Sequence, residues 1–452
     1  MKKVAFLILL IISVLCVILD LKHFEDNNYY LDLLFKDKKY KNIETIIQVK
    51  NEVSQKDFKS IFQAQDINNN FKDLDYKVTL KTNKDDINLS DCLKVSGNIS
   101  LPQIIQNDET LYQFPYREYL AKDDIYLLLN VKKFEKVDSC HSINIYQKLQ
   151  LYFLNYKLKI TKIFLEKYDQ PYAGLVAGVL IAGKGLMNNN TLNNFKRVSL
   201  SHVVVLSGSN VSIIIFSIKF IFDNLFLILK FRKNFIIDFI KKILIILCIT
   251  SFVLLTGGGA PIYRAFISSV FGLIIFNNKT SQLYSLTIVV LIMTIINPMG
   301  SLYDPSFHLT CCATYGLIMF TKSFDDFMIY SKLNLLPNFL REIISVTLAT
   351  QVFVFPYILF MSGSFSSVFL ISNVLILPLI PFVMFLGFMS LFPLIDSVCI
   401  FLNNIILKLI FYLVDILANI PFGYFEFNKK ISLIILIVYG FIFLFLLKWI
   451  KK

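Results

Sequence analysis

Histidine is scarce in this 452-residue chain, and the four that occur, His23, His141, His202 and His308, lie far apart. None belongs to an H-x-H or H-E-x-x-H pair, the spacings with which histidines hold a hydrolytic metal ion. The sequence therefore predicts no metal site, and no motif for another cofactor takes its place.

Nucleotide-binding motifs are missing as well. Gly178, Gly183 and Lys184 have the G-x-x-x-x-G-K spacing of a phosphate-binding loop, but Gly185 stands where that loop needs a Ser or Thr to bind magnesium. The intervening residues are apolar and continue a helix-like run instead of following a strand. We therefore expect neither ATP binding nor enzyme activity, and directional work must come from a partner or a gradient.

Charged residues make up only 17% of the chain, whereas 56% of residues are hydrophobic and the mean hydropathy is +0.62. This balance predicts a mainly α-helical, polytopic membrane protein. Several apolar runs are shorter than the roughly 20 residues of a full span, so broken or re-entrant helices are expected among about nine or ten passes. The runs cover residues 4–19, 203–229, 243–256, 261–276, 283–296, 307–321, 343–361, 366–392, 397–419 and 431–449.

The first run follows Lys2 and Lys3 and has no small-residue cleavage site before Asp20. Residues 1–19 are therefore expected to be an uncleaved signal-anchor transmembrane helix. Because lysines mark the cytoplasmic side, the N-terminus is placed in the cytoplasm and residues 20–150 outside the cell membrane.

Basic residues are in excess only in the membrane half. Residues 20–150 carry 19 basic and 21 acidic side chains, whereas residues 151–452 carry 24 and 11. The positive-inside rule accounts for such an excess, and binding of a polyanion such as nucleic acid does so too. Net charge alone does not separate these two explanations.

Residues 20–142 alternate between apolar and polar side chains in stretches such as TIIQVK, YKVTLK and LKVSGNIS. This period predicts a small, exported β-barrel or sheet. Its two cysteines, Cys92 and Cys140, are a disulfide candidate that would contribute about 4 kcal/mol in the chain-entropy model, although two free thiols fit a reducing compartment. The other five cysteines lie in apolar runs, where thiols act as small hydrophobes.

Residues 143–170 place apolar side chains at helical spacing, with lysines between them. The pattern predicts an amphipathic helix, either on the outer membrane interface or packed as a linker against the β domain.

A polar cluster interrupts the second apolar run. His202, Ser207, Gly208, Ser209 and Asn210 lie within the string SHVVVLSGSNVSIIIF. Polar groups at bilayer depth are costly unless they face protein or water, so this cluster is a candidate lining, in which residues 207–210 break a helix and expose backbone amides. The alternative is hydrogen bonding between packed helices.

Two further polar residues stand in apolar surroundings. Arg264 follows Pro261 by three residues, near an expected helix start, and an arginine facing lipid there would cost about 3 kcal/mol. It should face a cavity, pair with an acid or extend to the interface. His308, like His202, is either a bonded partner between helices or part of the lining.

Four islands of sequence, in order, resemble the signature of the ComEC-type competence proteins. They are SHVVVLSGSNVSI, GGGAPIYRAFISS, NPMGSLYDPSFHLTCCATYGL and SVTLATQVFVFPYILFMSGSFSSVFLISNVLILPLIP. In the exported domain, FPYREYLAKDDIYLLL is similar to the element that closes an OB-like domain in that family. The resemblance covers roughly residues 110–395.

The resemblance implies an OB-like domain over residues 20–142 and a competence channel over residues 171–452. Such a channel passes single-stranded DNA into the cytoplasm during natural transformation, with a cytosolic helicase and a surface DNA receptor as partners. Asn373 of the fourth island joins the candidate lining, while Asn210 and His308 replace residues more common in the family. The chain has no H-x-H-x-D-H motif, so the nuclease activity of members with a metallo-β-lactamase-like domain is not carried over, and a separate nuclease is a further expected partner.

Two other classes of function remain open from the residues. An intramembrane serine hydrolase would use Ser207 or Ser209 as nucleophile, with His202 or His308 as base. A transporter of a small polar solute would explain broken helices but not an OB-like domain.

Overall fold

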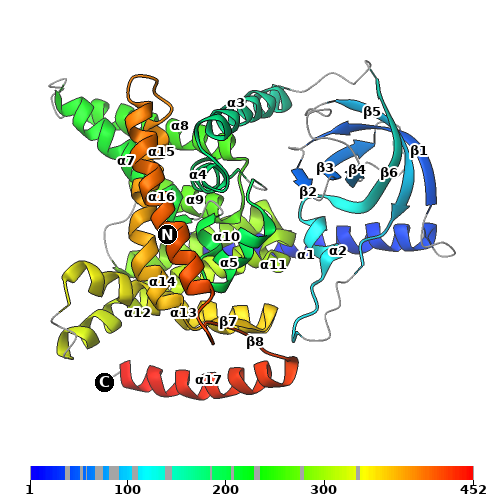
Figure 1. Cartoon of the computed structure of the whole chain (residues 1–452). Helices are drawn as coiled ribbons and strands as arrows, with labels where there is room; N and C mark the ends of the chain where they lie inside the picture. The colour runs from blue at the N-terminus through cyan, green and yellow to red at the C-terminus, as the bar shows by residue number, and fades with distance from the viewer. Residues whose placement is uncertain are drawn as a thin grey trace. The chain divides into compact units, whose positions relative to one another are not determined.

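The structure, a computed structural model shown in Figure 1, divides into two compact units. The first comprises Met1–Ile105, Phe114–Leu158 and Leu291–Asp304, and the second holds the remaining segments. The residues described are 2–35, 41–50, 54–56, 59–66, 75–80, 91–103, 110–137, 145–183, 186–204, 208–228, 235–274, 279–331 and 336–450.

A closed barrel of five strands forms the body of the first unit. Its strands run in the order β1-β5-β6-β4-β3, and β3 pairs back with β1 to close the ring, while the short β2 extends β3. All pairings are antiparallel except that of β4 with β6, which is parallel. The strands are β1 (Lys41–Val49), β2 (Ser54–Lys56), β3 (Lys59–Asp66), β4 (Asp75–Leu80), β5 (Cys92–Ser100) and β6 (Ile125–Val137). The predicted β domain is thus present as a small barrel.

Alternating side chains fill the barrel, as the period of two requires. Tyr76, Val78 and Leu80 of β4 are buried, whereas Lys77 and Thr79 between them are partly exposed. The core also includes Leu31 of α1 (Lys2–Leu34), a helix that continues well beyond the apolar run at residues 4–19. The longer helix follows from packing, since its second half contributes apolar residues to the barrel core.

Two short helices belong to the same unit. α2 (Tyr116–Ala121) precedes β6, and α11 (Pro298–Tyr303) carries Met299, which is buried in the same core. The Asn297 side chain accepts a bond from Gly300 N, capping α11, and donates one to Lys122 O at 2.8 Å. The third island of sequence therefore contributes its NPMGSLY segment to the barrel unit.

The second unit is built of helices. α3 (Ile145–Lys167) and α10 (Lys279–Ile296) begin in one unit and end in the other. The helices that lie wholly within the second unit are α4 (Tyr172–Ile181), α5 (Asn189–Arg197), α6 (Ser201–Val204), α7 (Gly208–Ile228), α8 (Phe235–Thr256), α9 (Ala260–Ile274), α12 (Pro305–Tyr330), α13 (Asn338–Ser362), α14 (Phe369–Ile376), α15 (Ile380–Met389), α16 (Asp396–Ala418) and α17 (Lys429–Ile450). The short strands β7 (Ser364–Ser366) and β8 (Tyr424–Glu426) pair beside them.

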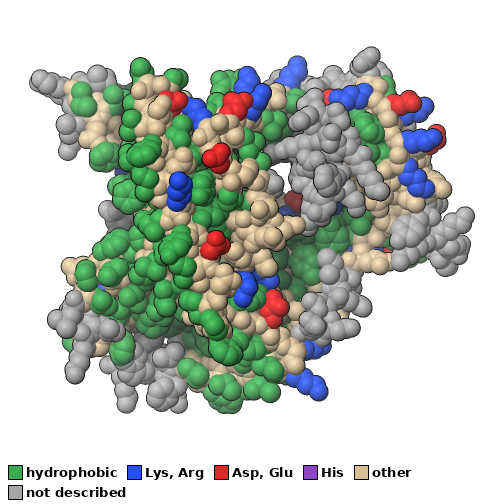
Figure 2. All heavy atoms as spheres, in the orientation of Figure 1, with side chains coloured by type: hydrophobic (Ala, Val, Ile, Leu, Met, Phe, Trp, Pro, Cys, Tyr) green, Lys and Arg blue, Asp and Glu red, His purple; other side chains and the backbone are tan. Residues whose placement is uncertain are grey.

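Several of these helices carry hydrophobic side chains on their exposed side as well as on their buried side, and Figure 2 shows many of them on the face in view. On α16, Leu407 and Ile410 are buried, while Phe401, Ile405 and Tyr412 are among its exposed large side chains. A helix that is apolar all round belongs in a bilayer or a large core. Four helical segments in the described residues are long and apolar enough to cross a membrane: Asp238–Thr256, Asn338–Ser362, Phe369–Met389 and Asp396–Ala418. The chain is a mainly α-helical membrane protein, as predicted, and the number of passes stays a prediction.

Close helix packing explains Gly178, which the sequence places in an incomplete phosphate-loop spacing. A Cβ on this residue of α4 would meet the backbone carbonyl oxygen of Val204 at the end of α6. Glycine is therefore required there because the two backbones touch.

Candidate polar site at the start of α7

The polar cluster lies where one helix ends and the next begins. α6 ends at Val204 and α7 begins at Gly208, so Gly208, Ser209 and Asn210 form the first turn of α7. Gly208 and Asn210 are buried. Ser207 and the side chain of Ser209 lie outside the described residues. The helix break predicted for residues 207–210 is therefore wrong for Gly208, Ser209 and Asn210, which are helical.

A run of three glycines positions Arg264. Gly257, Gly258 and Gly259 have φ angles of +80°, +72° and +136°, which only glycine adopts readily. Their turn ends α8 and starts α9, so Arg264 lies in the first turns of α9, as its spacing from Pro261 predicts.

Gly208 and Arg264 meet although 56 residues separate them in the sequence. A Cβ on Gly208 would lie 2.6 Å from Nη2 of Arg264 and 3.6 Å from the carbonyl oxygen of Pro261. The guanidinium therefore lies against the backbone of the first residue of α7. Any side chain at Gly208 would occupy the same space.

Arg264 has no acidic partner among the described residues. Its Nε is buried and lacks a hydrogen-bond partner there. In contrast, Arg117 is 3.1 Å from Asp32, and Arg341 is 2.7 Å from Asp325. Because the amino end of a helix also carries partial positive charge, both groups at this place favour an anion.

Arg264 also lies near α12, which packs against α9. The thiol of Cys311 on α12 is close to the guanidinium. One turn earlier on α12, Nδ1 of His308 is 2.9 Å from the hydroxyl of Tyr357 on α13. The sequence did not identify Tyr357 or Cys311 because both lie in apolar helices among many similar residues.

The other two lining candidates are separate. His202 is exposed on α6. Asn373 on α14 is 6% exposed, and its Oδ1 has no partner among the described residues. Next to it, the hydroxyl of Ser372 donates to Val198 O at 2.7 Å. No contact joins either His202 or Asn373 to Arg264 in the part of the chain that is described.

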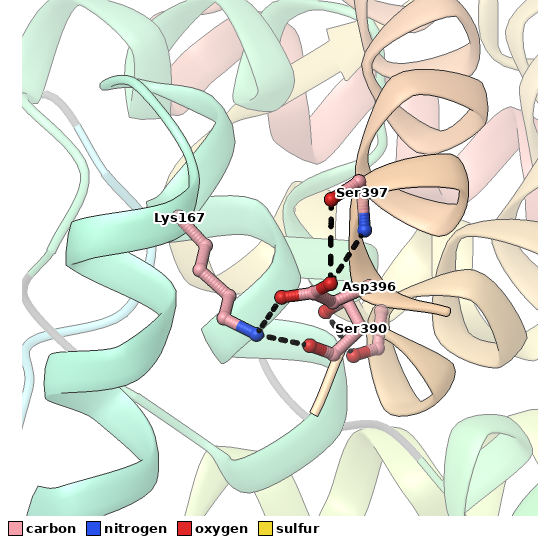
Figure 3. Close-up of polar contacts among 5 residues, drawn as sticks. Lys167, Ser390, Asp396 and Ser397 are labelled. Atoms are coloured by element: carbon pink, nitrogen blue, oxygen red, sulfur yellow. Dashed lines mark hydrogen bonds and ion pairs between the residues drawn. The ribbon is translucent and has the colours of Figure 1, made fainter. Parts of the chain in front are cut away.

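A polar contact that sequence reasoning missed joins three helix ends (Figure 3). Nζ of Lys167, the last residue of α3, donates to Ser390 O after α15 at 2.6 Å and is 2.9 Å from Oδ2 of Asp396, the first residue of α16. The backbone N of Ser397 donates to the other carboxylate oxygen at 2.8 Å. A lysine at the carboxyl end of a helix and an aspartate at the amino end of another each complement the helix dipole. The sequence shows such residues near helix ends, but it does not show which two of them pair.

The described cysteines fall into two groups. The five in apolar runs are free, and Cys92 is disulfide-bonded. Cys140, its predicted partner, lies outside the described residues. Within the described part of the chain, no group of three or more His, Cys, Asp or Glu residues could hold a metal ion.

Comparison with known proteins identifies one family. No curated protein and no solved structure matches the chain. A family model described as "Competence protein" matches residues 179–452, which include α6, α7, α9 and α12 and thus the Gly208–Arg264 contact. This match covers more than half of the 452 residues, and the chain therefore belongs to the competence protein family.

Proposed function

We propose that the chain is a channel of the cell membrane that passes single-stranded DNA into the cytoplasm. Membership of the competence family supports a role in DNA uptake. Beyond this role, we propose that the DNA passes as a single strand and that its route runs along the amino end of α7. A cytosolic helicase would pull the strand and a surface receptor would deliver it, because the sequence has no ATP-binding motif of its own.

The contact between Gly208 and Arg264 carries the proposal. A DNA strand brings one negative charge with every phosphate, so its path needs cations that are not already neutralised by carboxylates. Burying an arginine without an acid is costly, which favours a charge that serves a ligand. Arg264 meets this condition among the described residues, whereas Arg117 and Arg341 are paired.

The connectivity of the barrel also supports a nucleic-acid function. Counted along the chain, its five main strands join in the order first, second, third, fifth, fourth and back to first, with the third and fifth parallel. We assign this barrel to the OB-like class, a five-stranded Greek-key barrel that commonly binds oligonucleotides. The exported barrel would then meet the strand before the helices do.

Deleting the gene in a transformable host tests the function. The proposal predicts that fluorescent DNA still collects at the cell surface but that no labelled strand reaches the cytosol. Returning the gene restores entry. Unchanged entry in the deletion strain would contradict the proposal, and loss of surface capture would assign the chain to an earlier step.

A further inference from the structure

One face of α3 combines exposed lysines with exposed tyrosines. Lys148, Tyr152, Asn155, Lys159 and Lys162 follow one another at intervals of four, three, four and three residues, which places them along one side of the helix. All five are exposed. In Figure 2, Lys and Arg side chains gather over this helix.

The aromatic part of this face is a pair of rings. Tyr152 is 57% exposed and Tyr156, one turn on, is 48% exposed. Their ring centroids are 5.2 Å apart with an angle of 48° between the planes, and the two side chains are hydrogen-bonded to each other. The pair presents two neighbouring π-surfaces at the edge of the lysine row.

The second half of α3 packs its opposite face against protein. Phe164 is fully buried, and together with Ile160 it packs into the core of the polytopic helices. A helix that lies in a membrane interface needs a free apolar face, with its lysines on the other side. On α3, Lys148, Lys159 and Lys162 share one side with the exposed rings, whereas Lys157 on the other side is buried, so the helix lacks that segregation.

The charge of the exposed face of α3 suits a polyanion. It carries Lys148, Lys159 and Lys162, with one glutamate, Glu166, 3.9 Å from Lys162. The other two lysines of the helix are not part of this face, because Lys157 is buried and Lys167 is paired with Asp396. From Lys148 to Lys162 the axis rises about 21 Å, which is long enough to follow several nucleotides of an extended strand. Aromatic rings beside a row of cations are the features with which proteins bind single strands without regard to sequence.

We propose that this Tyr–Lys face, made of Lys148, Tyr152, Asn155, Tyr156, Lys159 and Lys162, binds single-stranded DNA. Tyr152 and Tyr156 stack on bases, and the lysines contact phosphates. This inference rests on the proposed function, because it takes single-stranded DNA as the ligand, but it does not depend on the proposed route past Arg264. Every base offers a π-face, so the site tolerates all sequences.

Fluorescence anisotropy tests the proposal with the full-length protein in neutral lipid nanodiscs and a labelled oligothymidylate. Tyr152→Leu/Tyr156→Leu is expected to weaken binding roughly fivefold or more, because stacking is lost. Tyr152→Phe/Tyr156→Phe keeps both rings and should bind like the unmodified protein. Tyr29→Leu, which changes an exposed tyrosine of α1, is the matched control and should have no effect.

The lysines have a separate readout. Lys148→Gln/Lys159→Gln should make the slope of log affinity against log salt shallower by about 1 to 2, since up to two phosphate contacts are lost. Unchanged affinity in the double-leucine variant would overturn the proposal. In that case, protection of Tyr152 from an aqueous quencher in anionic nanodiscs would identify the lipid surface, and not DNA, as the ligand of this face.

The two proposals fail separately. If the double-leucine variant binds DNA normally while Arg264→Gln blocks entry into cells, the α3 site is wrong and the channel stands. If the double-leucine variant loses binding while Arg264→Gln admits DNA, the route past Arg264 is wrong and the α3 site stands.

Discussion

The guanidinium of Arg264 fills the space in which a side chain at Gly208 would lie, with Nη2 only 2.6 Å from the position of a Cβ. The glycine of the SGSN segment leaves room for this contact, which brings a cation to the amino end of α7. A substitution at either Gly208 or Arg264 would disrupt it.

Gly208→Ala should displace the guanidinium without unfolding the protein, because the obstructing atom is the far end of a flexible side chain. We expect normal accumulation in the membrane and DNA entry reduced about tenfold, which corresponds to ~1.4 kcal/mol, the scale of one lost charge-assisted hydrogen bond. Immunoblotting and uptake of labelled DNA measure the two quantities.

Gly440→Ala is the matched control, since a Cβ on that residue of α17 would meet nothing within 4 Å. It should leave both quantities unchanged. Full DNA entry in Gly208→Ala would show that the position of Arg264 against α7 is unimportant.

Lys167 is expected to stabilise the second unit by joining three helix ends. Lys167→Met removes its bonds to Asp396 and to Ser390 O. The thermal midpoint of the purified protein, measured by size-exclusion chromatography after heating, should fall. Lys162→Met, at an exposed lysine of the same helix, should leave it within error. Equal midpoints in all three proteins would mean that the contact contributes nothing to stability.

The buried carboxyl group of Asp75 should make the barrel sensitive to pH. Asp75 is 2% exposed, and burial raises its pKa, although its contacts with Lys50 and Gln63 act in the opposite direction. A raised folded pKa stabilises the fold below the unfolded value of about 3.9, and this contribution is lost as the pH rises through the folded value. Asp75→Asn removes this titration.

Hydrogen exchange of β4 amides, compared between the two full-length proteins at each pH, measures the difference. The protection of the unmodified barrel relative to Asp75→Asn should decrease from pH 4 towards pH 7. The control is Asp91→Asn, which removes a carboxylate that is more exposed than that of Asp75. A difference that stays constant or grows with pH would be the wrong sign.

The barrel could be predicted because its cause is local. Alternation of apolar and polar residues, as in DYKVTL of β4, fixes which side chains enter a core. The place of Arg264 in the first turns of a helix was predictable for the same reason, since the preceding glycines and Pro261 act locally. The break predicted for residues 207–210 was not found at Gly208, Ser209 and Asn210, which are helical.

The remainder depends on tertiary contacts that no local pattern encodes. The helix α1 extends to Leu34, although the apolar run that predicts it ends at residue 19. The extension follows from tertiary packing, because the second half of the helix contributes side chains to the barrel core. Likewise, Gly208 and Arg264 come together through the crossing of α7 and α9, which neither segment specifies. His308 is bonded to Tyr357, a partner 49 residues away that composition alone could not identify.

The most direct test of the central claim is entry of labelled single strands into the cytosol of cells that carry Arg264 variants. Arg264→Gln should accumulate normally and reduce entry by at least about tenfold, while Arg264→Lys, which keeps the charge but loses the planar fork, should retain part of it. Arg341→Gln, at an arginine paired with Asp325, is the control and should admit DNA normally. Normal entry in Arg264→Gln, at normal protein levels, would contradict the account.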